Sequence, residues 1–291
     1  MKDLPHLDGV RHSWVDAGGV RIHVAELGPE DGPPLVLQHG WPQHWWCWNK
    51  VAPQLADRRR VIMPDLRGHG WSEAPRDGYE KDQLARDVVG VLDALGIEGT
   101  GYVGHDWGGF VGFHLADIAP ERVSAFLFLS IPHPWPSRHD QRNPRRLAAL
   151  AYQIPLATPP AGELFVLSGG LSAMFAKGAP EGTFGPADLA AYDATFRTRR
   201  GARVSSLMYR SFLLHEFGPI LAGRFDDVRL LHPARLMAGS DDPIFAGARG
   251  DGHEQNAPNL VVERVPGAGH FLPEERPELV VQRARELFSA Q

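Results

Sequence analysis

Short apolar runs alternate with amphipathic stretches along much of the chain. Runs of the kind that a parallel sheet buries on both faces lie at 34–38, 61–64, 123–129, 234–239 and 260–265. The stretch 20–27 alternates polar and apolar residues like a half-buried strand, and apolar residues recur at helical spacing at 84–95 and 279–288. Strands that alternate with helices predict an α/β fold built on a mostly parallel, doubly wound sheet.

The pattern changes after Pro132. From there to about residue 217, helical patterns at 147–153 and 204–214 are interrupted by proline and glycine pairs, and no clear strand is present. We therefore predict an α/β core formed by residues 1–131 and 225–291, with a helical cap at 132–224 inserted between its two parts.

The stretch 104–108, with the sequence Gly-His-Asp-Trp-Gly, joins an apolar run to a helical pattern. Glycines on both sides of Asp106 allow the sharp turn of a nucleophile elbow. A carboxylate that attacks an sp³ carbon forms an ester, which water can reopen, whereas a serine would form a stable ether. Asp106 therefore indicates alkyl transfer through a covalent ester. The alternative is that Asp106 only caps the following helix.

Two later loops supply candidate partners for Asp106. Asp242 follows the apolar run 234–239, and His270 lies in the glycine-flanked loop after the run 260–265. Nucleophile, acid and histidine in this order are typical of α/β-hydrolases. His270 would activate water, and Asp242 would orient its ring. Asp241 is the alternative acid.

The loop 39–42, His-Gly-Trp-Pro, ends the run 34–38 and is expected beside the elbow. The backbone N–H groups of Trp41 and Trp107 are the candidate oxyanion hole, and we interpret the side chain of His39 as structural. The same Gly- and Pro-rich loop is also compatible with a plain structural turn.

Two tyrosines of the predicted cap are candidates for the leaving oxygen. The chain has five tyrosines, and Tyr152 and Tyr209 lie in helical patterns on opposite sides of the insertion. A phenol is a better acid than water toward a developing alkoxide. The alternative for each is packing within the cap. The aromatic residues Trp45, Trp46 and Trp48 are expected either to line an apolar pocket or to pack in the core.

Composition excludes several other classes. The 291 residues are 43% hydrophobic and 22% charged, with a formal net charge of -5, so nucleic acid is not an expected partner. The single cysteine, Cys47, forms no internal disulfide, and no apolar run resembles a signal peptide or a membrane span. We expect a cytoplasmic protein that binds no membrane.

Together the motifs at 39–42, 104–109, 239–243 and 269–271 resemble those of α/β-hydrolase-fold epoxide hydrolases, over nearly the whole chain. The resemblance implies hydrolysis of an epoxide to a vicinal diol with no metal or organic cofactor. In that family two cap tyrosines hydrogen-bond the epoxide oxygen, and these match Tyr152 and Tyr209. The expected partners are an apolar epoxide and water.

Dehalogenases share the aspartate nucleophile. Haloalkane dehalogenases typically carry Asn in place of Trp41 and lack a tyrosine pair. Fluoroacetate dehalogenases typically place arginines where Trp107 and Phe110 stand here. Haloalkane dehalogenation is the enzymatic alternative, and a non-catalytic ligand-binding α/β-hydrolase is the third. The natural epoxide and the oligomeric state stay open.

Overall fold

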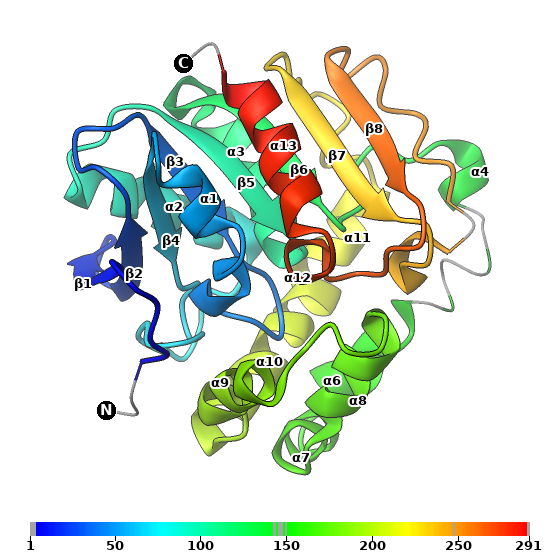
Figure 1. The fold of residues 1–291 in the computed structure, drawn as a ribbon. Coiled ribbons are helices and arrows are strands. Elements are labelled where there is room, and N and C mark those ends of the chain that lie inside the picture. The colour runs from blue at the N-terminus through cyan, green and yellow to red at the C-terminus, as the bar shows by residue number, and fades with distance from the viewer. Residues whose placement is uncertain (1–3, 142–143, 145–147, 149, 247, 290–291) are drawn as a thin grey trace.

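A computed structural model describes residues 4–141, 144, 148, 150–246 and 248–289. Its strands form one eight-stranded sheet in the order β1-β2-β4-β3-β5-β6-β7-β8 (Figure 1). The bounds are Arg11–Asp16 for β1, Arg21–Leu27 for β2, Pro34–Gln38 for β3, Arg60–Pro64 for β4, Thr100–His105 for β5, Val123–Leu129 for β6, Ala234–Gly239 for β7 and Leu260–Val265 for β8. Strands β3 to β8 pair in parallel, and β2 pairs antiparallel with both β1 and β4. The predicted α/β class and mostly parallel sheet are confirmed.

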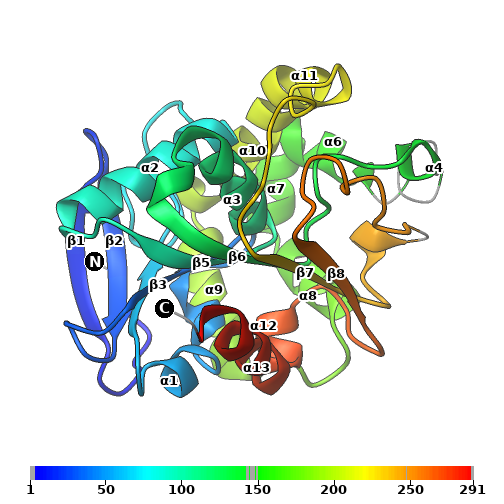
Figure 2. The same ribbon diagram turned by 90° about the horizontal axis from the view of Figure 1, so that it is seen from above.

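Helices cover both faces of the sheet, as Figure 2 shows. Helices α2 (Lys81–Ala94) and α3 (Trp107–Ile118) lie on one face, and α1 (Ala52–Leu55) and α13 (Pro277–Phe288) lie on the other. Apolar residues of α3 pack on β5 and β6, whose side chains are almost all buried. Because the central strands are covered on both sides, they consist of nearly continuous apolar runs.

The helical segment between β6 and β7 lies beyond the carboxyl ends of the parallel strands (Figure 1). Its helices are α4 (Arg138–Gln141), α6 (Gln153–Ala157), α7 (Ala161–Leu167), α8 (Gly170–Gly178), α9 (Pro186–Phe196), α10 (Arg199–Ser211) and α11 (Phe217–Leu221), with a π-helical turn at Phe212–Glu216 between the last two. No strand is present among the described residues of this segment. The limits of a separate cap at 132–224 stay a prediction.

The helix predicted at 147–153 lies partly outside the described residues. Leu150 is helical, Ala151 and Tyr152 form a turn, and α6 starts only at Gln153. Tyr152 therefore projects from a turn that precedes a helix and not from a continuous helix. The predicted helix at 204–214 corresponds to α10, which ends at Ser211 where the π-helical turn begins.

No helix in the described ranges is long and apolar enough to cross a bilayer. Cys47 is buried, and burial raises the pKa of its thiol, so it packs as a small apolar residue. The cytoplasmic location expected from the sequence stays a prediction.

Candidate active site

Asp106 lies at the sharp turn between β5 and α3. Its φ angle of 51° is left-handed, a conformation that a residue other than glycine adopts only under constraint. A Cβ atom on Gly108 would collide with the backbone carbonyl of Gln38, so only glycine lets β3 approach the turn this closely. The Asp106 side chain makes no capping hydrogen bond to α3, which argues against the plain helix-cap interpretation.

One oxygen of Asp106 is held by the loop after β3. The backbone N–H of Trp41 donates a 2.8 Å hydrogen bond to Oδ1 of Asp106. A Cβ atom on Gly40 would collide with the same oxygen, so the loop contacts the carboxylate closely because residue 40 has no side chain. The backbone N–H of Trp107, at the start of α3, lies near the carboxylate and lowers its pKa. The two predicted N–H donors thus meet at Asp106.

The other oxygen faces His270. Nε2 of His270 lies 3.5 Å from Oδ2 of Asp106, and Nδ1 lies 3.1 Å from Oδ2 of Asp242. Asp242 is buried beside η4 (Pro243–Phe245), whereas Asp241 is exposed and accepts a hydrogen bond from Ser240. Of the two candidate acids, the structure therefore places only Asp242 against the histidine.

The charges in this group stabilise one another. Burial raises the pKa of Asp106, but the hydrogen bond and the charge of His270 outweigh that effect and hold the pKa below its ordinary value. Burial lowers the pKa of His270, but Asp242 and Asp106 together raise it to about 10. The two shifts favour an ionised Asp106 beside a protonated His270.

The predicted tyrosine pair comes together above this group. The hydroxyls of Tyr152 and Tyr209 lie 3.4 Å apart, and the Tyr209 ring packs edge-on against the rings of Trp41 and Trp107. Burial and the charge of Asp106 raise the pKa of Tyr152, and burial, Tyr152 and Asp106 raise that of Tyr209. Both phenols therefore keep their protons at neutral pH.

Two cavities meet at the carboxylate. The larger, of about 420 Å³, is reached by Asp106, His270 and Tyr152, and the smaller, of about 140 Å³, by Asp106, Trp107 and Tyr152. Apolar side chains form most of both linings, among them Leu156, Met174, Phe110, Phe212 and Ile220. The aromatic residues at 45, 46 and 48 line neither cavity, and Trp45 and Trp48 are fully buried in the core.

Within the described part of the chain, no group of three histidine, cysteine or acidic side chains is placed to hold a metal ion. The side chains gathered at the site are a buried carboxylate, a paired imidazole and two phenols.

Known proteins resemble the chain along its whole length. The soluble epoxide hydrolase of Corynebacterium sp. (strain C12) is 31% identical over 296 residues, which cover 96% of this chain and 98% of that protein. The chain belongs to the epoxide hydrolase family of the α/β-hydrolase fold. This assignment makes it an enzyme of the hydrolase class.

Other similarities agree with membership in the epoxide hydrolase family. The alpha/beta hydrolase fold family matches residues 33–159. The AB hydrolase superfamily protein YfhM of Bacillus subtilis (strain 168) is 41% identical over 131 residues, which cover 44% of this chain and 46% of that protein. The solved structure of epoxide hydrolase CorEH superposes with a TM-score of 0.83 at 28% identity, covering 97% of this chain and 99% of that one. The predicted α/β-hydrolase fold is confirmed.

Several buried polar residues of this epoxide hydrolase family member were not singled out from the sequence. Lys81 is fully buried, bonds Glu216 at 2.9 Å and lies 4.3 Å from the centre of the Trp107 ring. Glu274 is buried against Gln43 and Tyr192. A lysine at a helix start and a glutamate near a helix start normally suggest solvent exposure, so the sequence carried no signal for either.

Proposed function

We propose that the chain hydrolyses an apolar epoxide to a vicinal diol through a covalent ester on Asp106. The observation that carries this proposal is that the two oxygens of the carboxylate have different partners. Oδ1 accepts a hydrogen bond from the backbone N–H of Trp41, and Oδ2 lies 3.5 Å from Nε2 of His270. Asp106, His270 and Tyr152 line the same cavity. The similarity to the soluble epoxide hydrolase of Corynebacterium sp. supports the same substrate class.

In the first step, Oδ2 of Asp106 attacks one epoxide carbon and the bond from that carbon to the ring oxygen breaks. The leaving oxygen takes a proton from the pair Tyr152 and Tyr209, which hold their protons because burial raises their pKa. An alkoxide is more basic than a phenolate, so this transfer is favourable despite the raised phenol pKa. The product of this step is an alkyl ester of Asp106.

In the second step, His270 takes a proton from a water molecule that attacks the ester carbonyl carbon. Ester formation removes the negative charge of Asp106, so the pKa of His270 falls. His270 then releases its proton, which replaces the one that the tyrosine pair gave to the leaving oxygen, and the neutral ring becomes available as the base. The negative charge that develops on Oδ1 is stabilised by the N–H groups of Trp41 and Trp107. The bond between Cγ and Oδ2 then breaks, and His270 gives its proton to Oδ2, which leaves as a hydroxyl of the diol. The proton left on the new carboxyl group of Asp106 passes to His270, which restores the carboxylate and the imidazolium.

The experiment that tests this function follows diol release from an aryl epoxide and halide release from a haloalkane. Asp106→Ala should abolish diol formation, and Asp241→Ala is the matched control because Asp241 is exposed and does not contact His270. Halide release without diol would establish haloalkane dehalogenation instead. Neither product, with retained binding of the epoxide, would favour a ligand-binding protein.

A further inference from the structure

The peptide unit between Gly40 and Trp41 has both of its polar groups engaged. Its N–H, from Trp41, donates to Oδ1 of Asp106 at 2.8 Å. Its C=O, from Gly40, accepts a hydrogen bond from Nδ1 of His39 at 2.9 Å. Because a trans peptide is planar and its N–H and C=O point in opposite directions, a bond that holds the carbonyl also sets the direction of the N–H.

The hydrogen bonds of His39 define its tautomer. The backbone N–H of Leu66 donates to Nε2 at 2.9 Å, so Nε2 carries no proton. The carbonyl of Gly40 is only an acceptor, so Nδ1 carries the proton. The ring is fully buried, and burial lowers the pKa of His39, which keeps the imidazole neutral. His39 therefore links Leu66 to Gly40 as a neutral ring with one donor and one acceptor.

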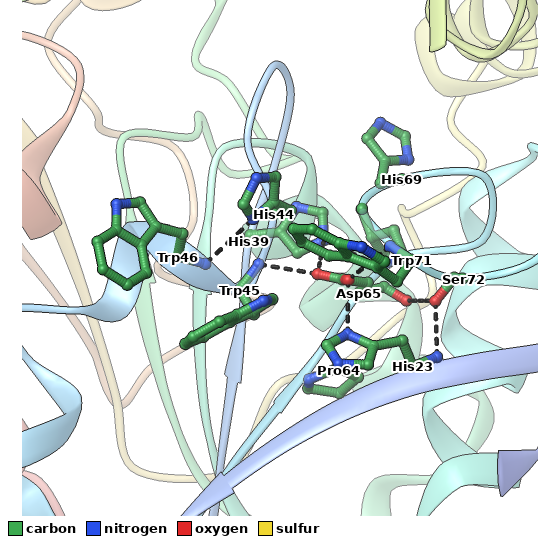
Figure 3. Close-up of polar contacts among 12 residues, drawn as sticks. His23, His39, His44, Trp45, Trp46, Pro64, Asp65, His69, Trp71 and Ser72 are labelled. Atoms are coloured by element: carbon green, nitrogen blue, oxygen red, sulfur yellow. Dashed lines mark hydrogen bonds and ion pairs between the residues drawn. The ribbon is translucent and has the colours of Figure 1, made fainter. Parts of the chain in front are cut away.

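Asp65 holds the far end of this link. Its carboxylate accepts hydrogen bonds from the N–H of Trp45 at 2.8 Å, the N–H of Trp71 at 3.0 Å and Nδ1 of His23 at 2.7 Å (Figure 3). Burial raises the pKa of Asp65, but the neighbouring histidines outweigh it and lower the pKa, so the group stays ionised. Leu66, the next residue, is thus held by a buried network that joins the ends of β2 and β4 to the segment after β3.

We propose that His39 is a positioning residue that keeps the Trp41 N–H directed at Oδ1 of Asp106 by holding the Gly40 carbonyl. This inference rests on the proposed function, in which Oδ1 carries the negative charge during ester hydrolysis. Ring opening uses Oδ2 and places no new charge on Oδ1. Loss of the bond to Gly40 should therefore slow ester hydrolysis and leave alkylation nearly unchanged, and the alkyl-enzyme should accumulate.

Two substitutions separate the two bonds of the ring. In His39→Asn the side-chain amide nitrogen takes the place of Nδ1 and keeps the donor to Gly40. In His39→Gln the amide oxygen reaches toward the place of Nε2 and keeps the acceptor for Leu66 but loses the donor. His114→Gln is the matched control, because His114 is a buried histidine of α3 with no hydrogen bond to either loop.

The measurement is a single turnover of styrene oxide, in which intact-protein mass spectrometry follows the formation and decay of the alkyl-enzyme. We expect His39→Gln to slow ester decay by at least about tenfold, toward the range for a lost oxyanion donor, with alkylation changed by less than about threefold. His39→Asn should retain most of the decay rate, and His114→Gln all of it. Melting temperatures establish that each variant is folded.

Equal slowing of both steps in His39→Gln, or equal decay rates in the Asn and Gln variants, would overturn the inference. Nitrogen NMR of the unsubstituted protein supplies a test that needs no variant: the Nδ1–H tautomer is expected, and an Nε2–H tautomer of His39 would overturn it. The same experiment tests the proposed function separately. If that function is wrong, even the unsubstituted protein forms no alkyl-enzyme.

Discussion

Nδ1 of His270 lies 3.1 Å from Oδ2 of Asp242. Asp241, the residue before Asp242, is exposed, and within the described structure its side chain forms a hydrogen bond only with Ser240. Two neighbouring carboxylates with the same sequence context thus have different environments. One can orient the imidazole and stabilise its charged form, and the other cannot.

We expect Asp242→Asn to lower kcat by at least about 100-fold, because the imidazole loses the charge that orients and stabilises it. Asp241→Asn should stay within about twofold of the unsubstituted enzyme, since exposed substitutions away from a site have small effects. Steady-state diol formation checks both. The reverse order of effects would assign the orienting role to Asp241.

The tyrosine pair is expected to act only in ring opening. Tyr152→Phe or Tyr209→Phe should each slow alkylation, and the double variant should abolish it. Tyr152 lines both cavities, the hydroxyl of Tyr209 lies 3.4 Å from its hydroxyl, and no other described tyrosine lines either cavity. Rapid-mixing measurement of alkyl-enzyme formation checks this. Full activity of the double variant would mean that another group protonates the leaving oxygen.

Glu274 should make stability depend on pH. Burial raises its pKa from 4.5 to about 8, so the folded protein keeps a proton that the unfolded chain releases. The free energy of unfolding therefore falls as pH rises from about 4.5 to about 8, and this contribution is flat above that range.

Glu274→Gln retains a neutral partner for Gln43 and Tyr192 and removes the titration. The free energy of unfolding of Glu274→Gln minus that of the unsubstituted protein should increase between pH 5 and pH 8 by on the order of 3 kcal/mol. Urea unfolding at a series of pH values checks this. Parallel curves for the two proteins would show that Glu274 is already ionised at pH 5.

The ion pair of Lys81 and Glu216 joins α2 to the helical insertion. Lys81→Met should destabilise the protein by about 3–5 kcal/mol, because it leaves the glutamate buried without its cation. The double variant Lys81→Met with Glu216→Gln should recover much of that loss. Denaturant unfolding of the four proteins in a double-mutant cycle measures the coupling. If the losses in unfolding free energy of the two single variants simply add up in the double variant, the two side chains do not interact directly.

The sheet could be predicted because its central strands are buried on both faces and so appear as continuous apolar runs, as in β6. The edge strand β1 is half-buried, and no pattern singled it out. The elbow was recognisable because the turn requires glycines at fixed positions around Asp106. Apolar runs and fixed glycine positions can both be recognised in a sequence, because each depends only on residues close together in the chain.

Relationships between distant residues were less accessible. The pair Lys81 and Glu216 is 135 residues apart, and each residue taken alone suggests the surface. The side chain of His39 was interpreted as structural from the sequence. Its hydrogen bond to Gly40 could not be anticipated, because the orientation of the ring depends on Leu66 and on the network around Asp65. Tyr152 and Tyr209 were candidates from their place in two helical patterns of the insertion and from the family resemblance, and only the tertiary fold brings their hydroxyls together.

The central claim is that the oxygen added to the product comes from Asp106. A single turnover with excess enzyme in ¹⁸O-labelled water, analysed by mass spectrometry of the diol and of the peptide containing Asp106, tests it directly. The account predicts an unlabelled diol and one ¹⁸O atom in that peptide. A labelled diol with unlabelled Asp106 would show that water attacks the epoxide directly, and would contradict the covalent mechanism.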